Sequence, residues 1–139
     1  MRIDTMAPQD LDRLLSVGPG LVDHPIRPDQ ARAFPDNPLN LLVMAWHGDT
    51  AVGMAPATIL LHPDKPPSLF VNELGIHEDH LRQGVATALM TRLIELAQAR
   101  GCKGIWLGTE PENAAARALY LELGGVEETF VGFSWDEAF

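Results

Sequence analysis

The segment from Asn72 to Leu89 constrains the fold more than any other part of the chain. A strand-like run, SLFVNELGI (68–76), leads through the short loop HEDHLRQG into a long helix expected over about 83–100. Apolar residues recur in that helix at steps of three and four, which is the spacing of one buried helix face. Gly101 follows the pattern and is placed to end the helix. A strand that feeds directly into a long amphipathic helix predicts a sheet covered by helices.

The flanking segments predict the rest of a mixed α/β fold. Further strands are expected at 41–48, at 51–62 with a break near Pro56, at 103–109 and at 126–135. Further helices are expected at 8–16 and 113–123, with a short one around 28–34 inside the proline-rich loop region 18–40. The prediction is a single domain over residues 1–139, with a central mixed, mostly antiparallel sheet and helices on both faces.

The charge balance limits the class of partner. Ten Lys/Arg against nineteen Asp/Glu give a net charge of −9. An acidic surface argues against a nucleic-acid partner, which needs basic patches to displace counterions, and suits a cationic small molecule or a basic peptide. The single Cys102 excludes an internal disulfide framework. The acidic N-terminus is unlike a signal peptide and no apolar run could span a membrane, so we expect a cytoplasmic protein without a membrane partner.

The start of the long helix has the features of an anion-binding turn. Small residues at Gly84 and Ala86 let the backbone approach a ligand closely. The free N–H groups of a first helical turn and the helix dipole then favour a pyrophosphate. The segment lacks the GxxxxGK[ST] and GxGxxG patterns, which disfavours ATP hydrolysis and dinucleotide binding. By itself the pattern is equally consistent with a tight turn that binds nothing.

Two motifs in order resemble the GNAT superfamily of acyl-CoA-dependent N-acetyltransferases. They are ELGIHEDHLRQGVATALM and, after KGIWLGT, NAAARALYLELGG, and the resemblance covers about residues 40–135. Within the superfamily, FVNELGI with its acidic Glu73, RQGVATAL and the ending VEETFVGFSWD are similar to the short aminoglycoside 3-N-acetyltransferases. Leu81 departs from the Arg or Gln of the motif. Because the cradle is made of backbone, we expect cofactor binding to be retained.

The resemblance implies acetyl-CoA as cosubstrate. The strand backbone at Leu74, Gly75 and Ile76 would bind the pantetheine arm as an added strand. Six consecutive residues would surround the pyrophosphate: Arg82, Gln83, Gly84, Val85, Ala86 and Thr87. Asn113 would bind the pantetheine, and Arg117 could meet the phosphates. From the residues alone, Asn113 is equally a helix N-cap and Arg117 equally a solvated side chain.

The resemblance also implies the proton-transfer groups. Tyr120 stands at the general-acid position that protonates the thiolate of coenzyme A, whereas its Ala/Leu-rich helix alone would indicate a core tyrosine. Glu73 is the first candidate for the base, as a buried carboxylate with a raised pKa, and its alternative is an exposed or ion-paired strand residue. Glu110 is the second candidate, as base or as anchor of the amine. His77 and His80 have HxxH spacing without a third ligand nearby, so no metal site is expected.

The expected function is direct acetyl transfer from acetyl-CoA to a primary amine, with no covalent enzyme intermediate because no activated nucleophile is visible. An aminoglycoside-like or polyamine-like cation is the first acceptor class. A peptide or protein amine and a non-catalytic acyl-CoA sensor remain alternatives. The expected last strand, with Phe130, Phe133 and Trp135, suggests a homodimer edge, and the carboxylates of Asp136 and Glu137 could attract a cationic acceptor.

Overall fold

A computed structural model of the chain describes residues 1–136, so Glu137 lies outside the described residues. The chain divides into two compact units, Met1–Gly108 and a second that begins at Thr109, and each is described by itself. No helix within residues 1–136 combines the length and the apolar character needed to cross a membrane.

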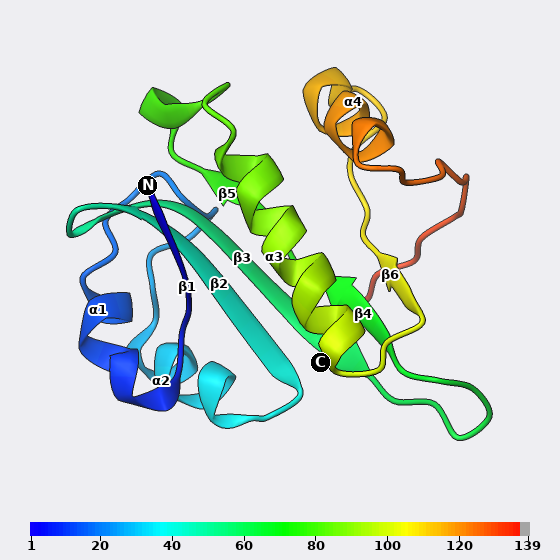
Figure 1. The fold of residues 1–139 in the computed structure, drawn as a ribbon, viewed down its shortest axis with the longest axis horizontal. Coiled ribbons are helices and arrows are strands. Elements are labelled where there is room, and N and C mark those ends of the chain that lie inside the picture. The colour runs from blue at the N-terminus through cyan, green and yellow to red at the C-terminus, as the bar shows by residue number, and fades with distance from the viewer. Residues whose placement is uncertain (137–139) are drawn as a thin grey trace. The chain divides into compact units, whose positions relative to one another are not determined.

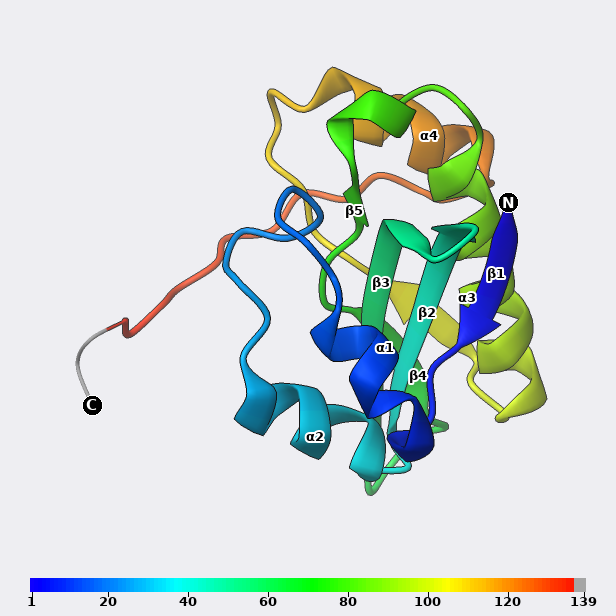
Figure 2. The ribbon, with the colours of Figure 1, turned by 90° about the vertical axis from the view of Figure 1, so that its left-hand side faces the viewer.

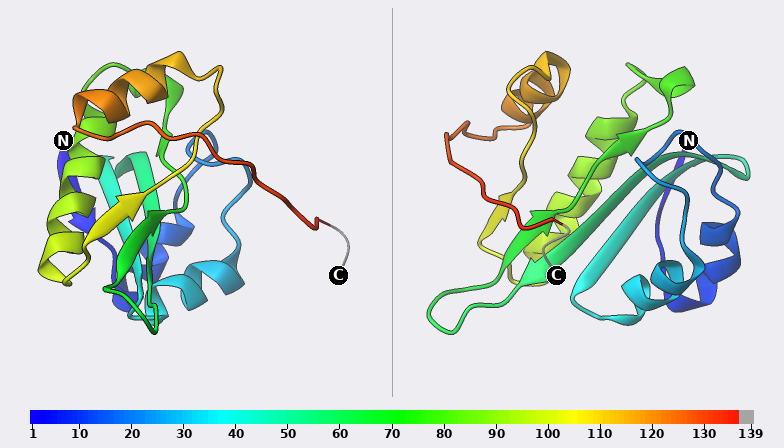
Figure 3. Two further views of the ribbon diagram at one scale, coloured as in Figure 1. Left: turned by 90° about the vertical axis from the view of Figure 1, so that its right-hand side faces the viewer. Right: turned by 180° about the vertical axis from the view of Figure 1, so that it is seen from behind.

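The first unit contains a sheet of six strands in the order β1-β2-β3-β4-β6, with β5 also paired to β3 (Figure 1). The strands are β1 (Arg2–Thr5), β2 (Asn40–His47), β3 (Thr50–Leu60), β4 (Ser68–Val71), β5 (Gly75–Ile76) and β6 (Gly104–Trp106). Only β6 is parallel to its neighbour, and Figure 3 shows it beside β4. The predicted mixed, mostly antiparallel sheet is therefore confirmed, and β1 is a strand that the sequence pattern did not indicate.

Helices cover both faces of this sheet. They are η1 (Pro8–Asp10), α1 (Leu11–Leu15), α2 (Pro28–Asp36), η2 (Glu78–His80) and α3 (Val85–Ala99). Figure 2 shows α1 and α2 in front of the sheet and α3 behind it. Alternate residues of β2, among them Leu42 and Met44, pack with α1 and α2, while α3 packs on the other face of β2 and β3. Burial on both faces explains why Leu41–Trp46 is an unbroken apolar run.

The chain between β4 and β5 corrects two strand predictions. β3 is not broken near Pro56 but runs from Thr50 to Leu60, and the break lies instead in the predicted strand 68–76. Pairing with β3 stops at Ala57↔Val71 and resumes at Met54↔Gly75. The three residues 72–74 therefore lie opposite only two residues of β3. Asn72 N donates to Pro56 O at 2.9 Å. Proline has no N–H to return to the same neighbour, so the ladder cannot continue and the chain bulges.

The second unit contains one helix, α4 (Ala114–Glu122), among its described residues. The strand predicted over 126–135 is wrong, since none of these residues is in a strand. Its apolar side chains are exposed instead, with Phe133 at 80% and Trp135 at 66%. Alternating apolar residues form a strand only when a neighbouring strand pairs with them. No such partner lies among the described residues of the second unit, so the predicted homodimer does not have this strand to support it.

Candidate active site

β5 leaves one backbone edge open for an extended ligand. On one side β5 pairs with β3 through Gly53↔Ile76 and Met54↔Gly75, and His77 N continues the ladder to Val52 O at 3.0 Å. On the other side, the parallel ladder between β4 and β6 ends at Phe70↔Trp106. Within Met1–Gly108 no strand therefore follows β5 along its outer edge. The predicted pantetheine-binding residues Leu74, Gly75 and Ile76 lie at this edge, where an amide-bearing chain can add as a further strand.

The start of α3 presents backbone donors that no side chain among residues 1–136 caps. Gly84 is the N-cap, with φ +79° and no side-chain cap, and Ala88 N is the first donor to bond back, to Gly84 O at 3.0 Å. The N–H groups of Val85, Ala86 and Thr87 therefore have no acceptor within the helix. The backbone of Arg82 is also left-handed, with φ +61°, so the loop turns sharply into the helix. Together with the helix dipole this geometry suits a pyrophosphate.

The side chains around this turn are open to a ligand. Arg82, Gln83, Gly84 and Thr87 are exposed, and Ala86 is half-buried. Val85 is buried and holds the helix start against β3, because a Cβ at Gly53 would lie 2.7 Å from Val85 Cγ1. Leu81, which departs from the family motif, points its side chain largely to solvent, with 55% exposed. The backbone donors are thus in place although the motif side chain is missing.

Glu73 lies in the bulge between β4 and β5. The sequence predicts a buried carboxylate, and the structure corrects this, because the residue is exposed. Partial burial of its carboxyl group nevertheless raises the pKa of Glu73, and the negative charge of Asp23 raises it further, while His24 lowers it. Among the described residues Glu73 forms no ion pair. A solvent-accessible carboxylate with a raised pKa is suited to accept a proton from an ammonium group or through water.

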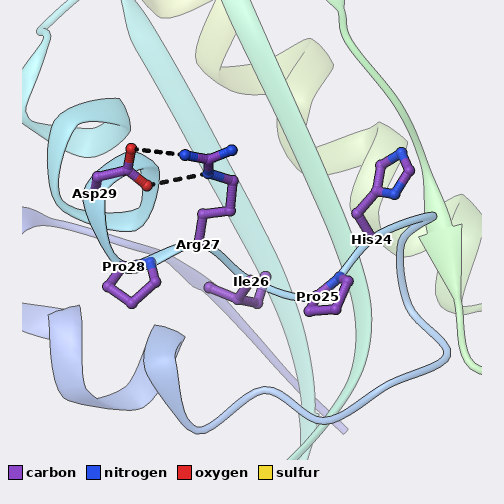
Figure 4. A pocket seen from close by; sticks show the side chains of 6 residues that line it. All are labelled: His24, Pro25, Ile26, Arg27, Pro28 and Asp29. Atoms are coloured by element: carbon purple, nitrogen blue, oxygen red, sulfur yellow. Dashed lines mark hydrogen bonds and ion pairs between the residues drawn. The ribbon is translucent and has the colours of Figure 1, made fainter.

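The loop 18–27 lies directly over β5, which sequence reasoning did not foresee. Leu21 is buried at 5% exposure, and its carbonyl oxygen occupies the space that any side chain at Gly75 would need. This contact brings Asp23 and His24 to the base candidate. Figure 4 shows His24 on the stretch of loop beside β5, in a concave surface lined by residues 24–29. Arg27 there is paired with Asp29 through two contacts of 3.2 Å. In the sequence this segment is marked only by its many prolines and glycines, which indicate a loop but not the surface on which the loop packs.

The second unit carries the remaining predicted residues. Tyr120 on α4 is half-buried, and loss of solvent raises the pKa of its phenol. Asn113 is the N-cap, with its Oδ1 accepting from Ala116 N at 3.1 Å. Glu110 is exposed, and its backbone carbonyl accepts from Asn113 N at 3.0 Å. The structure therefore gives Asn113 the capping role, and it keeps Tyr120 protonated to higher pH than a free phenol.

Arg117 is held by protein groups. Its Nε and Nη2 donate to the Glu127 carboxylate at 2.6 and 3.1 Å, and Nη1 donates to Pro111 O at 2.9 Å. Both Glu127 and Pro111 belong to the second unit, so the guanidinium fastens the chain after α4 to the chain before it. The sequence does not indicate this pairing, because its pattern predicts that Glu127 lies in a strand.

Histidines gather near η2 without forming a metal site. The structure adds His47 to the predicted pair, with its ring 5.0 Å from that of His80, which lies 5.9 Å from the ring of His77. His77 Nδ1 accepts from Asp79 N at 3.2 Å and caps η2. No group of three or more His, Cys, Asp or Glu within residues 1–136 is arranged to hold a metal ion.

Comparison with known proteins gives matches of three kinds. The model of the acetyltransferase (GNAT) family matches residues 10–124. Over 56 residues the chain is 41% identical to the ribosomal protein bS18-alanine N-acetyltransferase of Escherichia coli K12. That match covers 40% of this chain and only 38% of the enzyme, so the chain matches well under half the length of this curated relative.

Solved structures share the fold at low sequence identity. An aminoglycoside acetyltransferase from an uncultured soil metagenomic sample, solved with sisomicin, has a TM-score of 0.86 at 15% identity, covering 96% of this chain and 94% of that one. Aminoglycoside N-acetyltransferase AAC(6')-Iy, solved with CoA, has a TM-score of 0.78 at 21% identity. The match covers 98% of this chain and 99% of that one.

Proposed function

The chain belongs to the acetyltransferase (GNAT) family, and from this premise we propose that it transfers the acetyl group of acetyl-CoA to a primary amine of a cationic small molecule, aminoglycoside-like or polyamine-like. The observation that carries the proposal is the combination, in one unit, of an open β5 edge, an uncapped α3 start and the pKa-raised carboxyl group of Glu73. A cytoplasmic location and a homodimer remain predictions from the sequence.

Acetyl-CoA would bind mainly through backbone groups. Its pantetheine amides would add to the edge of Leu74–Ile76, and its pyrophosphate would accept hydrogen bonds from the first turn of α3, with Arg82 as the nearby cation. Holding the thioester against a rigid sheet edge converts the reaction into a step between positioned groups. In this scheme Asn113 orders the start of α4, and Arg117 contributes to the second unit rather than to the phosphates.

The chemical step would be sequential. The amine arrives as an ammonium ion, and the Glu73 carboxylate takes its proton directly or through water; Glu110 is the second candidate for this role. The amine nitrogen then attacks the thioester carbon, so that a C–N bond forms, the C–S bond breaks and the nitrogen releases its second proton to water, from which Tyr120 regains the proton it gives to sulfur. The Tyr120 hydroxyl gives its proton to the departing thiolate, which a phenol does well because its pKa is close to that of a thiol.

The acceptor class follows from the acidic side of the site. Asp23 lies close enough to Glu73 to raise its pKa, and the chain carries a net charge of −9. These charges attract an amine that is cationic in solution. The related structure solved with sisomicin, an aminoglycoside acetyltransferase, supports the same class.

A peptide amine is the second candidate acceptor. It is favoured by the 41% identity over 56 residues to the enzyme that acetylates an alanine of ribosomal protein bS18. We rank it second because the matched segment covers only 38% of that enzyme.

The decisive experiment measures thiol release from acetyl-CoA with a panel of acceptors. The panel contains an aminoglycoside, a diamine, a simple monoamine and a peptide with an N-terminal alanine, and acetylated products are identified by mass spectrometry. We expect turnover with the polycations. Turnover only with the peptide would favour the second candidate, and a raised melting temperature with CoA but no turnover would indicate an acyl-CoA sensor.

A further inference from the structure

We propose that Asn72 is a positioning residue for Glu73, and that a hydrogen-bond chain through Thr58 and Asn40 holds it in place. The catalytic consequence rests on the proposed function, in which Glu73 is the base. The physical claim, that this chain sets where the Glu73 carboxyl group lies, can be tested without any turnover.

The hydrogen-bond chain runs from the bulge after β4 through β3 to β2, and Thr58 Oγ1 also lies 3.3 Å from Asn72 Oδ1, a second acceptor for its single proton. Asn72 Nδ2 donates to Thr58 Oγ1 at 3.3 Å, and Thr58 Oγ1 donates to Asn40 Oδ1 at 3.0 Å. Asn40 Nδ2 then donates to Phe34 O at 3.0 Å, near the end of α2. Thr58 and Asn40 each accept one hydrogen bond and donate one along this path, so each bond strengthens the next.

The bulge needs a second anchor because its backbone is weakly held. Val71 is the last residue of β4 that pairs with β3, and Gly75 is the first of β5. Between them, Asn72 N to Pro56 O, at 2.9 Å, is the backbone hydrogen bond to β3. Pro56 cannot return a bond to Asn72 O, because it has no N–H. The Asn72 side chain supplies the missing tie to β3 through Thr58, one residue before Glu73.

This anchor acts on the base candidate and not on the cofactor strand. β5 keeps its own pairing with β3 through Gly53 and Met54, and His77 N is tied to Val52 O. Loss of the Asn72 anchor therefore frees Glu73 while the edge that would hold the pantetheine stays in register. A base works only within hydrogen-bond reach of its proton, and a displacement of about 1 Å can be costly in rate.

Thr58→Val tests the proposal, since it removes the hydroxyl and keeps the branched shape of the side chain. We expect kcat to fall about fivefold to tenfold, with the KM for acetyl-CoA within about twofold of its original value. Thr58→Ser restores the hydroxyl and is expected to recover most of kcat. The matched control is Thr50→Val, which makes the same change at the exposed start of β3. The Thr50 side chain takes no part in the hydrogen-bond chain.

The second readout is the pKa of the Glu73 carboxyl group, measured by carbon NMR titration. The charged groups that influence Glu73 are Asp23, which raises its pKa, and His24, which lowers it. A released Glu73 gains solvent and moves away from Asp23, so we expect its pKa to fall toward the ordinary value in Thr58→Val and to return in Thr58→Ser.

Two results would overturn the proposal. One is an unchanged Glu73 pKa in Thr58→Val. The other is a loss of activity in Thr58→Val that Thr58→Ser does not restore and that Thr50→Val shows as well. If the unmodified chain binds CoA but acetylates no amine, the proposed function fails. The NMR titration then still decides whether Asn72 and Thr58 position Glu73.

Discussion

Glu73 and Tyr120 would make the two proton transfers, and the protein raises the pKa of both. The two groups need opposite protonation states, yet both shifts act on rate in the same direction. Glu73 must be unprotonated to act as a base, so a raised pKa moves the acidic fall in rate to higher pH. Tyr120 must be protonated to act as an acid, so a raised pKa moves the alkaline fall in rate to higher pH as well. Both shifts move the active range toward alkaline pH, where more of the amine acceptor is uncharged.

Tyr120→Phe tests the general acid. We expect kcat to fall about a hundredfold, because the thiolate then leaves without a positioned proton donor. The KM for acetyl-CoA is expected to stay within about twofold, since the hydroxyl acts on the leaving group, and the alkaline fall in kcat should disappear. Steady-state thiol release across pH measures all three, and circular dichroism controls for folding. An unchanged kcat would remove Tyr120 from the mechanism.

Asp23→Asn and His24→Asn test the electrostatic surroundings of Glu73. Asp23 raises the pKa of Glu73, so its neutralisation should shift the acidic limb of kcat/KM to lower pH. His24 lowers that pKa, so its removal should shift the limb to higher pH. Asp36→Asn removes the same charge as Asp23→Asn from an exposed position at the end of α2 and should leave the limb in place. Shifts in the same direction for both loop variants would contradict this account.

At the scale of elements, the open edge of β5 and the loop over it form one assembly. Gly75 allows the loop to pack closely on β5, because the carbonyl oxygen of Leu21 lies where a Cβ would be. The glycine matters here for space and not for its φ angle, which is not in the left-handed region. The loop in turn is fixed by the buried Leu21 side chain, so the loop beside Glu73 and the strand proposed to bind the pantetheine are held together.

Gly75→Ala should therefore damage both stability and acceptor binding. We expect a loss of about 1–3 kcal/mol in the free energy of unfolding, because the added methyl group must displace backbone. The displaced loop should raise the acceptor KM severalfold. Gly18→Ala in the same loop is the control, since a Cβ there meets nothing within 4 Å. Denaturant unfolding with acceptor kinetics measures both, and equal behaviour of the two variants would show that the contact is not tight.

At the scale of the whole molecule, an acidic protein has to bind a polyanionic cosubstrate. The net charge is −9, and Arg117 is already engaged by Glu127 and Pro111. In the proposed function, neutral N–H groups at the start of α3 would resolve this conflict, because they can bind phosphate oxygens without adding a charged side chain. The acidic surplus is then available to attract the acceptor.

Salt should separate the two substrates. We expect kcat/KM for a diamine acceptor to fall about fivefold between about 50 and 500 mM NaCl, because salt screens attraction between exposed charges. The KM for acetyl-CoA serves as the internal control and should change less, since the proposed cofactor site binds it mainly through short hydrogen bonds from the backbone. An acceptor kcat/KM that does not respond to salt would show that the net charge plays no part in capturing the amine.

Local patterns were enough to predict much of this fold. The periodic apolar residues of α3, its glycine entry and its stop at Gly101, where φ is +79°, are all set by neighbours in sequence. The Asn113 cap, one of the two roles that the sequence leaves open, is likewise set by neighbours in sequence. The sequence pattern does not predict β1, because Arg2–Thr5 is too short and too polar to be recognised as a strand without its partner β2.

The sequence by itself determined the family, the α3 turn and the strands whose apolar patterns are strong. Only the tertiary structure decided where the break in the β4–β5 strand falls, because Pro56 keeps its own strand intact and denies a hydrogen bond to the neighbouring one. It also decided that loop 18–27 lies on Gly75, that Glu73 is exposed yet has a raised pKa, and that 126–135 is not a strand. The physical reason is shared: each of these features depends on a partner distant in sequence, or on its absence, and local periodicity carries no information about that partner.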